Sequence, residues 1–232
     1  YKGKLTEEDI LNQIDHVVTK RFPDRRIPVK KFKIQFTRMG EPAFNDVVLD
    51  VLQKIPKRYD APGLIPSLST VGPRNCGNFF ERLRQIKNNL YSNGKFQMQF
   101  SIHTTDIDKR NLLIPTEKMS FQEISEYGKQ FFSPGDRKIT LNFIVMENYP
   151  VNPEVIRKYF DPSIFLIKLT PLNPTDKAAA NNLNSKLNPN DNNSVSSLVN
   201  DFQNLGFQTI TSIGELGENE IGSNCGQFVS KS

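Results

Sequence analysis

Two residues far apart in the sequence have types and settings that could do chemistry. Cys225 is one of only two cysteines in the 232-residue chain, and it precedes Gly226 in a polar stretch near the chain end. A thiol beside a glycine on a tail without apolar periodicity can swing over a neighbouring site. Glu41, between Gly40 and Pro42, closes an alternating apolar segment with a bend that carries a carboxylate. Taken alone, the two have ordinary interpretations, an incidental cysteine and a turn.

The elements that must position these residues follow from apolar periodicity, which alternates between a helical and an extended pattern. Thr6, followed by three acidic residues, predicts the start of a first helix, and Pro23 predicts its end. The segments expected as strands are 32–36, 64–69, 96–102, 139–146, 164–169 and 207–213. The later helices are expected at 44–52, 79–90, 121–132, 153–159 and 196–205. Strands separated by helices predict parallel βαβ units, and hence an α/β fold that forms a partial parallel barrel.

We expect residues 1–232 to form one domain. The asparagine-rich segment 181–194 has a composition typical of a surface loop. The tail 214–232 carries Cys225 and lacks a periodicity that would attach it to the core.

Polar residues close four of the expected strands. In a parallel α/β barrel, chemistry gathers at the carboxyl ends of the strands. The residues at these ends are Gly40 with Glu41, Ser69, Ser101 with Ile102 and His103, and Asn173. Alone, Ser69 or Asn173 is usually a turn residue and His103 a structural imidazole. Their occurrence at successive strand ends predicts a shared site at one edge of the sheet.

Composition permits an anionic partner without establishing one. The net charge is +5 and the sequence pI is about 9.1. The basic clusters are Lys20-Arg21 with Arg25-Arg26, Lys30-Lys31-Phe32-Lys33, Lys57-Arg58, and Arg82, Arg84 and Lys87. Such surfaces attract RNA by counterion release, although a solvated face explains them equally well.

Other functional classes find no support in the sequence. It has no apolar run long enough for a membrane span and no signal-peptide core at its start. Two cysteines cannot build a disulfide framework, and free thiols fit the cytoplasm. With only two histidines besides, the residues cannot form an ordinary Cys/His metal site.

The strand-end residues and the tail together resemble the radical-SAM methyltransferases that modify an adenosine of large-subunit ribosomal RNA at carbon 2 or carbon 8. The likeness rests on five motifs in the family's order, none of them specific alone. They are Arg38-Met39-Gly40-Glu41-Pro42, Ser69-Thr70-Val71-Gly72, Ser101-Ile102-His103-Thr104 with Asp106, Arg110, Leu113, Ile114 and Pro115, then Pro171-Leu172-Asn173-Pro174 and Asn224-Cys225-Gly226-Gln227. The match covers nearly the whole chain.

The resemblance implies a role for each strand-end residue. Gly40 and Glu41 would hold the amino group of S-adenosylmethionine. The rest of this cofactor would be lined by Ser69, Ser101, Ile102, His103 and Asn173. Cys225 would be the methyl carrier. Radical chemistry supplied by cofactors would then move the carbon to an adenine ring. The implied partners are ribosomal or transfer RNA and an electron donor of the flavodoxin or ferredoxin type, with no membrane.

The sequence departs from the family at several points. The three cysteines that bind the family's 4Fe–4S cluster are absent, and the first residues resemble the segment just downstream of them. We therefore expect the cluster ligands upstream of residue 1. Arg38 and Val71 replace a glycine and a serine of the family, and Cys76 matches no family position. Two alternatives stay open: a radical-SAM enzyme with another substrate, and a non-catalytic RNA- or ribosome-binding protein that has lost its cluster.

Overall fold

The fold is an α/β structure built on one six-stranded parallel sheet. The computed structural model describes residues 3–37, 40–173, 175–187 and 196–212. The strands are β1 (Phe32–Phe36), β2 (Leu64–Thr70), β3 (Gln97–Ser101), β4 (Ile139–Val145), β5 (Phe165–Pro171) and β6 (Thr209–Thr211). They lie in sequence order, and every neighbouring pair is parallel. The predicted fold class is confirmed, and in the described part of the chain the sheet is open between β1 and β6.

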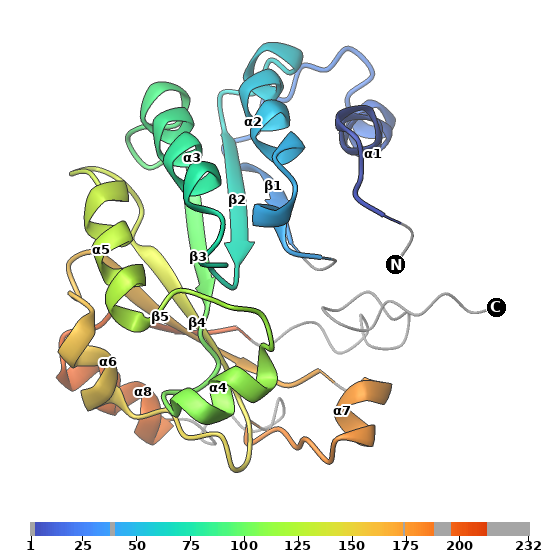
Figure 1. Cartoon of the computed structure of the whole chain (residues 1–232). Helices are drawn as coiled ribbons and strands as arrows, with labels where there is room; N and C mark the ends of the chain where they lie inside the picture. Colours follow the sequence, from blue (N-terminus) through green and yellow to red (C-terminus); the bar gives the residue numbers. More distant parts are fainter. Residues whose placement is uncertain (1–2, 38–39, 174, 188–195, 213–232) are drawn as a thin grey trace.

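The strand order places the helices. Right-handed crossovers between strands that are adjacent in both sequence and space put every connecting helix on the same face. Figure 1 shows α2, α3, α5 and α6 along one side of the sheet. The helices are α1 (Glu7–Arg21), α2 (Val47–Arg58), α3 (Gly77–Leu90), α4 (Ile107–Leu113), α5 (Phe121–Phe131), α6 (Pro153–Tyr159), α7 (Asp176–Ala180) and α8 (Ser196–Asn204). The other face of the sheet is therefore left for ligands, as inside a barrel.

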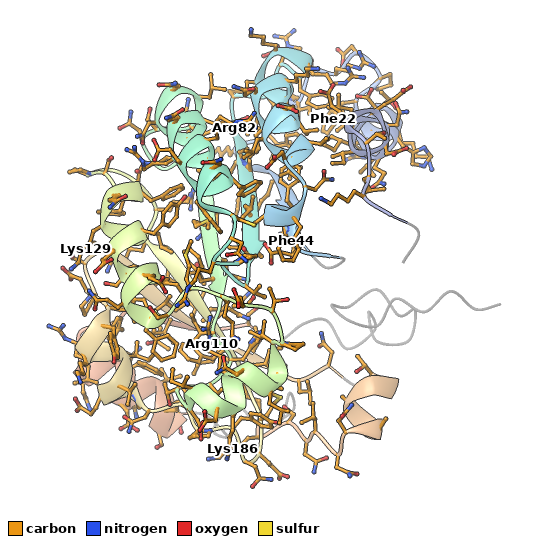
Figure 2. The ribbon with its side chains drawn as sticks, viewed as in Figure 1. Phe22, Phe44, Arg82, Arg110, Lys129 and Lys186 are labelled. Carbon is orange, nitrogen blue, oxygen red and sulfur yellow. The ribbon has the colours of Figure 1, made fainter. Side chains whose placement is uncertain are left out.

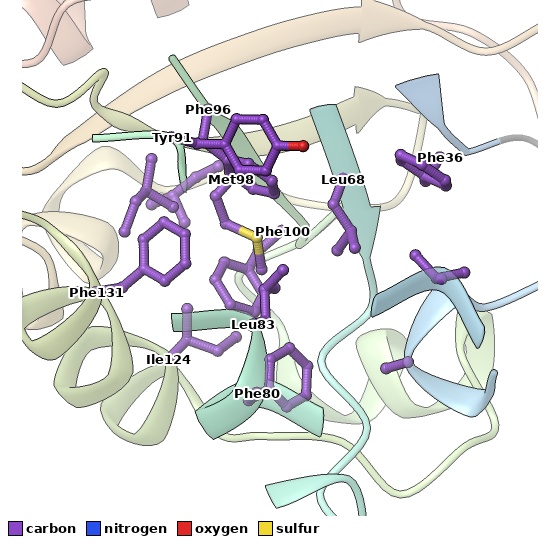
Figure 3. Packing of buried hydrophobic residues seen from close by; sticks show 14 of the residues in the cluster. Phe36, Leu68, Phe80, Leu83, Tyr91, Phe96, Met98, Phe100, Ile124 and Phe131 are labelled. Carbon is purple, nitrogen blue, oxygen red and sulfur yellow. The ribbon is translucent and has the colours of Figure 1, made fainter. Parts of the chain in front are cut away.

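The hydrophobic core lies between the sheet and these helices. Leu68, Met98 and Phe100 point from β2 and β3 toward α3 and α5, where they meet Leu83 and Ile124 (Figure 3). All five side chains are buried. Because alternate residues of a strand face opposite ways, this packing assigns the residues between them to the other face.

Capping explains several helix starts. Thr6 and Asp9 form a reciprocal capping box at α1, as do Ser120 and Glu123 at α5. The start of α1 was predicted correctly from Thr6. The short helices α4 and α7 were not predicted, because each follows a strand end with too few periodic residues to produce a pattern.

Helix α2 differs from its predicted range of 44–52. It starts later because Pro42–Phe44 forms a separate 3-10 helix. It also continues to Arg58, through Pro56. A proline removes the N–H that would bond to the carbonyl four residues earlier, here that of Leu52. The hydroxyl of Tyr91 donates a hydrogen bond to this carbonyl instead. Tyr91, which follows α3, thus provides the hydrogen bond that the Leu52 carbonyl lacks within its helix. This bond offsets part of the free-energy cost of a proline inside a helix.

The predicted loop 181–194 is only partly loop-like. Within residues 181–187, Lys186 N–H donates to the Val145 carbonyl, and Leu187 is buried. This segment therefore pairs with the chain at the end of β4, next to the buried side chain of Leu187. Residues 188–195 lie outside the described part.

Candidate functional site

The predicted site residues in the described part lie at one edge of the sheet. Gly40 and Glu41 follow β1, Ser69 is near the end of β2, and Ser101 ends β3. Ile102 and His103 come next, and Asn173 lies two residues beyond β5. Since all strands are parallel, their carboxyl ends meet at this edge, which we call the rim. Figure 1 shows α4 at the end of the sheet toward which β2 points. Cys225 lies outside the described residues.

Glu41 connects the ends of β1 and β2. Gly40 precedes it with a φ of 74°, a left-handed conformation that favours glycine. The carboxylate caps the 3-10 helix by accepting from the Ala43 N–H at 3.0 Å. It also accepts from the Val71 N–H at 2.9 Å and from the Thr70 hydroxyl. Thr70 thus positions Glu41, a role that was not predicted because only Ser69 of this pair was assigned to the site.

The carboxylate of Glu41 is half-buried and has no positive partner among the described residues. Burial raises the pKa of this carboxyl above its ordinary value, and its three hydrogen bonds offset the effect only in part. Neutral donors therefore position the carboxylate without neutralising it. An incoming cationic group would supply the missing charge, and it would lower the pKa of Glu41 on binding. The arrangement fits an ammonium group of a ligand.

The sheet face opposite the helices is polar. Gln99 Nε2 donates to Ser69 Oγ at 3.1 Å, and Gln97 Nε2 donates to Thr140 Oγ1 at 2.9 Å, each across a strand pair. We call this side, from Lys33 on β1 to Lys168 on β5, the inner face. Its polar members, related by strand register, are Lys33, Gln35, Ser67, Ser69, Gln97, Gln99, Ser101, Thr140, Asn142 and Lys168, and the same register also places Ile65, Ile144 and Leu166 there. Such a lining suits a polar ligand.

Asn142, on the inner face, was missed in the sequence. It pairs in register with Ser101, and its side chain is 8% exposed. Its Oδ1 is buried and has no hydrogen-bond partner in the part of the chain that the structure describes. A buried acceptor without a donor costs free energy, so this position fits a donor from a bound molecule. The sequence signal was an asparagine inside the apolar run of β4, where polar side chains are uncommon.

His103 has a strained backbone. Its φ is 66°, and the Thr104 N–H donates to the Ile102 carbonyl at 2.9 Å, which closes a tight γ-turn around it. The Ile144 N–H lies 3.4 Å from His103 Nδ1 and donates to it, so Nε2 carries the proton of the neutral ring. Burial lowers the pKa of His103 to about 4, with a smaller contribution from the Arg110 charge. The imidazole is therefore a neutral donor at the rim over the physiological range.

This neutral histidine predicts a loss of stability in acid. The pKa is about 4 in the folded state and 6.5 for an ordinary histidine, so the unfolded chain binds a proton first as pH falls. The free energy of unfolding should drop between pH 6.5 and pH 4, by about 3 kcal/mol at most. Urea unfolding at several pH values would show a smaller drop in His103→Asn, because asparagine tolerates positive φ. His16→Asn, at an exposed position of α1, is the matched control. Equal drops in all three proteins would contradict this assignment.

Arg110 is a second group that was not assigned to the site. It is the buried residue of α4, and its Nη1 donates to the Met119 carbonyl at 3.1 Å (Figure 2). Its Nε and Nη2 are buried and find no hydrogen-bond partner within the described ranges, and the guanidinium lies 5.4 Å from the centre of the Phe121 ring. Burial lowers its pKa to about 10. Because it contacts the start of α5, Arg110 supports the rim from the helix side.

Ile102 and Cys76 are the two remaining residues that were singled out in the sequence. Ile102 is fully buried, so only its backbone can contribute to the rim. Cys76 precedes α3 and is half-buried. Burial raises the pKa of its thiol, and the Glu41 and Asp46 charges raise it further. This thiol therefore stays protonated, which agrees with its interpretation as incidental.

The basic clusters lie mostly away from the rim. The connecting helices α2, α3, α5 and α6 run back from the rim, so their last turns lie toward the opposite edge of the sheet, and these last turns are basic, which favours the helix dipole. Many of these cations also have internal partners: Arg25 and Arg58 pair with Asp15, and Lys87 pairs with Asp136. The clusters therefore do not by themselves define an RNA surface at the rim.

The described residues offer neither a metal site nor a membrane-spanning helix. They contain no group of three or more His, Cys, Asp or Glu side chains placed to hold a metal ion, so these residues do not fit an iron–sulfur cluster. No helix among them is long and apolar enough to cross a membrane.

Solved structures show what the fold is similar to. A radical SAM methyltransferase from Sphaerobacter thermophilus superposes with a TM-score of 0.69 at 16% identity, over 97% of this chain and 62% of that one. The chain shares its fold with radical SAM proteins. A domain of pyruvate-formate lyase-activating enzyme from Bacteroides vulgatus matches with a TM-score of 0.52 at 11% identity, over 78% of this chain and 98% of that domain. No protein-family profile and no curated protein matches the sequence.

Proposed function

We propose that this chain is the S-adenosylmethionine-binding part of a radical-SAM methyltransferase that acts on an adenosine of ribosomal or transfer RNA. The observation that carries the proposal is Glu41, a half-buried carboxylate that has no cationic partner among the described residues, at the rim of a fold shared with radical SAM proteins. The ammonium group of S-adenosylmethionine would supply the positive charge that Glu41 lacks. Gly40 permits the bend that presents Glu41, and Thr70 holds its carboxylate.

The other rim residues would recognise the remainder of the cofactor. Ser69 and Ser101 present hydroxyls, and Asn142 Oδ1 offers an acceptor. Neutral His103 offers its Nε2–H to an acceptor, and Asn173 lies two residues beyond the end of β5. The polar inner face thus supplies donors and acceptors to hydroxyl and amine groups, while Ile102 contributes only its backbone.

Cys225 would act as the methyl carrier. Its thiol loses a proton and attacks the methyl carbon of one S-adenosylmethionine, so that the new S–C bond forms as the sulfonium S–C bond breaks. The products are S-methylcysteine and S-adenosylhomocysteine. Reduction of a second cofactor molecule by a 4Fe–4S cluster would supply the radical chemistry for transfer to the adenine ring. The electrons would come from a flavodoxin or ferredoxin, in the cytoplasm. No step is assigned to a cluster held by the described residues, which lack a suitable ligand set.

Replacing Glu41 tests the cofactor site directly. Glu41→Gln keeps the size and an acceptor oxygen but removes the charge, so the affinity for S-adenosylmethionine should fall by about 1.5–3 kcal/mol. That is a factor of roughly 10 to 150 in Kd by calorimetric titration. The thermal midpoint should change little, because removing the costly ionised charge offsets the loss of a hydrogen bond that the amide nitrogen of glutamine cannot accept.

Glu8→Gln, at an exposed position of α1, is the matched control and should bind like the unmodified protein. Equal affinity in the Glu41 variant would make Glu41 a turn residue only. Absence of binding in every form would favour the non-catalytic alternative.

A further inference from the structure

A cavity of about 280 Å³ lies at the edge of the sheet where the strands begin, which we call the amino edge. From the sheet it is lined by Leu64, the first residue of β2, and by Lys95, which lies two residues before β3. From the helices it is lined by Tyr59 and Tyr91, which directly follow α2 and α3, the two helices that lie side by side in Figure 1. Because β2 has seven residues and spans about 23 Å, the cavity is separate from the rim and from the proposed cofactor site.

The wall of this cavity is built largely from apolar and aromatic side chains. The hydroxyl of Tyr59 donates to Asp15 Oδ1 at 2.6 Å, and the hydroxyl of Tyr91 donates to the Leu52 carbonyl. Both tyrosines therefore contribute ring carbons to the wall, and their hydroxyl groups are engaged within the protein. The other apolar residues of the wall are Pro56, Ala61, Pro62, Leu64 and Leu90. The volume is slightly below the range for drug-sized ligands, so the cavity suits a single flat ring system.

Asp60 and Lys95 supply the charged groups of the wall. Asp60 pairs with Arg26 at 3.6 Å, and these two side chains are 73% and 72% exposed. The Asp60 carboxylate thus has its charge offset and keeps acceptor positions toward water, while exposed Lys95 is a donor. A nucleobase has apolar ring faces and carries amino donors and acceptors on its edges, so it matches both parts of the wall.

Exposed cations border the cavity. They come from four separate segments and are Lys30, Lys57, Lys95 and Arg137. None of the four forms an ion pair within the part of the chain that the structure describes. The acidic residues beside them are already paired, Asp60 with Arg26 and Asp136 with Lys87. The amino edge therefore has an excess of positive charge, which attracts a polyanion through counterion release.

Backbone contacts hold these segments next to the cavity. Gly63 lies between two wall residues and packs against the segment of Lys30, since an added Cβ at Gly63 would be 2.3 Å from the Val29 carbonyl oxygen. Arg137 Nε donates to the carbonyl of Gly94, the residue before Lys95, at 2.7 Å. Lys57 directly follows the wall residue Pro56 in the last turn of α2. The cations and the cavity thus form one surface.

We propose that the amino edge is a second contact for the RNA substrate, in which the cavity holds one unpaired base and the surrounding cations bind the neighbouring phosphates. The choice of RNA rests on the proposed function. An acidic protein segment is the competing partner, but it would use the cations alone, whereas an unpaired base also fills an apolar cavity. Because about 23 Å separates the cavity from the rim, the bound base is not the one that is methylated. The contact positions the RNA.

Fluorescence anisotropy of a labelled single-stranded RNA oligonucleotide, measured without cofactor, tests this contact. K57A/K95A should weaken binding about tenfold at about 0.15 M salt and reduce the salt slope of log Kd by about 1.4, because each lost phosphate contact removes about 0.7. A61F fills the cavity without changing the charge, so it should weaken binding at least about fivefold and leave the salt slope unchanged. Both lysines are exposed, so K57A/K95A remains informative if A61F folds poorly.

The matched control is K129A/K158A, which removes the same charge from exposed positions in the last turns of α5 and α6 (Figure 2 labels Lys129). It should change the affinity by less than about twofold, because screening limits the reach of these charges. Equal losses in K57A/K95A and the control, or equal binding of an abasic oligonucleotide by the unmodified protein, overturn the proposal. If poly-glutamate binds as tightly as RNA and loses as much in K57A/K95A, the edge serves an acidic protein and the proposal is overturned. RNA binding at the amino edge without methyl transfer would instead count against the proposed function alone.

Discussion

Cys225→Ala is expected to abolish methyl transfer to RNA while leaving S-adenosylmethionine binding unchanged. The proposed cofactor site is built by Glu41, Thr70 and the inner face, whose residues all precede the tail in the sequence. The transferred carbon, by contrast, would have to form a bond to the Cys225 sulfur, and alanine has no atom that can accept it. The effect on activity should therefore be complete, and the effect on affinity should be negligible.

Two measurements separate these effects in protein supplied with its cluster. Transfer of a tritiated methyl group into RNA reports turnover, and calorimetry reports affinity. Cys76→Ser is the matched control, because it removes the other thiol of the chain and should retain activity. Undiminished transfer by Cys225→Ala would remove the methyl-carrier role and leave the tail a structural or partner-binding segment.

Lys87→Met is expected to lower the free energy of unfolding by about 3–5 kcal/mol, the range for breaking a buried ion pair. The Lys87 ammonium lies 2.6 Å from Asp136 Oδ2 and 4.9 Å from the centre of the Phe131 ring. The two side chains are 1% and 8% exposed. Methionine would fill the same space but leave the Asp136 charge buried with only the Ser133 and Gly94 N–H groups near it.

Urea unfolding checks this value. The double variant Lys87→Met/Asp136→Asn should recover most of the loss, because no unpaired charge remains and asparagine still accepts from Ser133. Lys129→Met, at an exposed position of α5, is the matched control and should change stability by no more than about 0.5 kcal/mol. A Lys87 variant as stable as that control would show that the pair contributes nothing to the fold.

The fold was largely predictable because its signals are local. The alternation of Phe32, Ile34 and Phe36 marks β1, and Thr6 with its acidic neighbours marks the start of α1. The late start of α2 was not predictable, because it depends on Glu41 capping a separate 3-10 turn. Its extension through Pro56 depends on Tyr91, whose hydroxyl comes from a residue 39 positions away from Leu52. Tertiary contacts of this kind leave no periodic signal in a single sequence.

The candidate site was likewise predictable only in part from the sequence. Strand-end positions predict that Gly40, Glu41, Ser69, Ser101 and His103 share a rim, since parallel strands end at one edge. The partners that set their chemistry come from other strands. Thr70 holds Glu41, Ile144 fixes the tautomer of His103, and Asn142 faces Ser101 across a strand pair. Register and burial determine these contacts, and neither can be read from spacing alone.

The measurement that tests the central claim most directly is the mass of the tail peptide that contains Cys225 after incubation with S-adenosylmethionine and a reductant, in protein supplied with its cluster. The account predicts the gain of one methyl group on Cys225 and none on Cys76, and the loss of that signal in Glu41→Gln at low cofactor concentration. An unmodified Cys225 in protein that methylates RNA would contradict it.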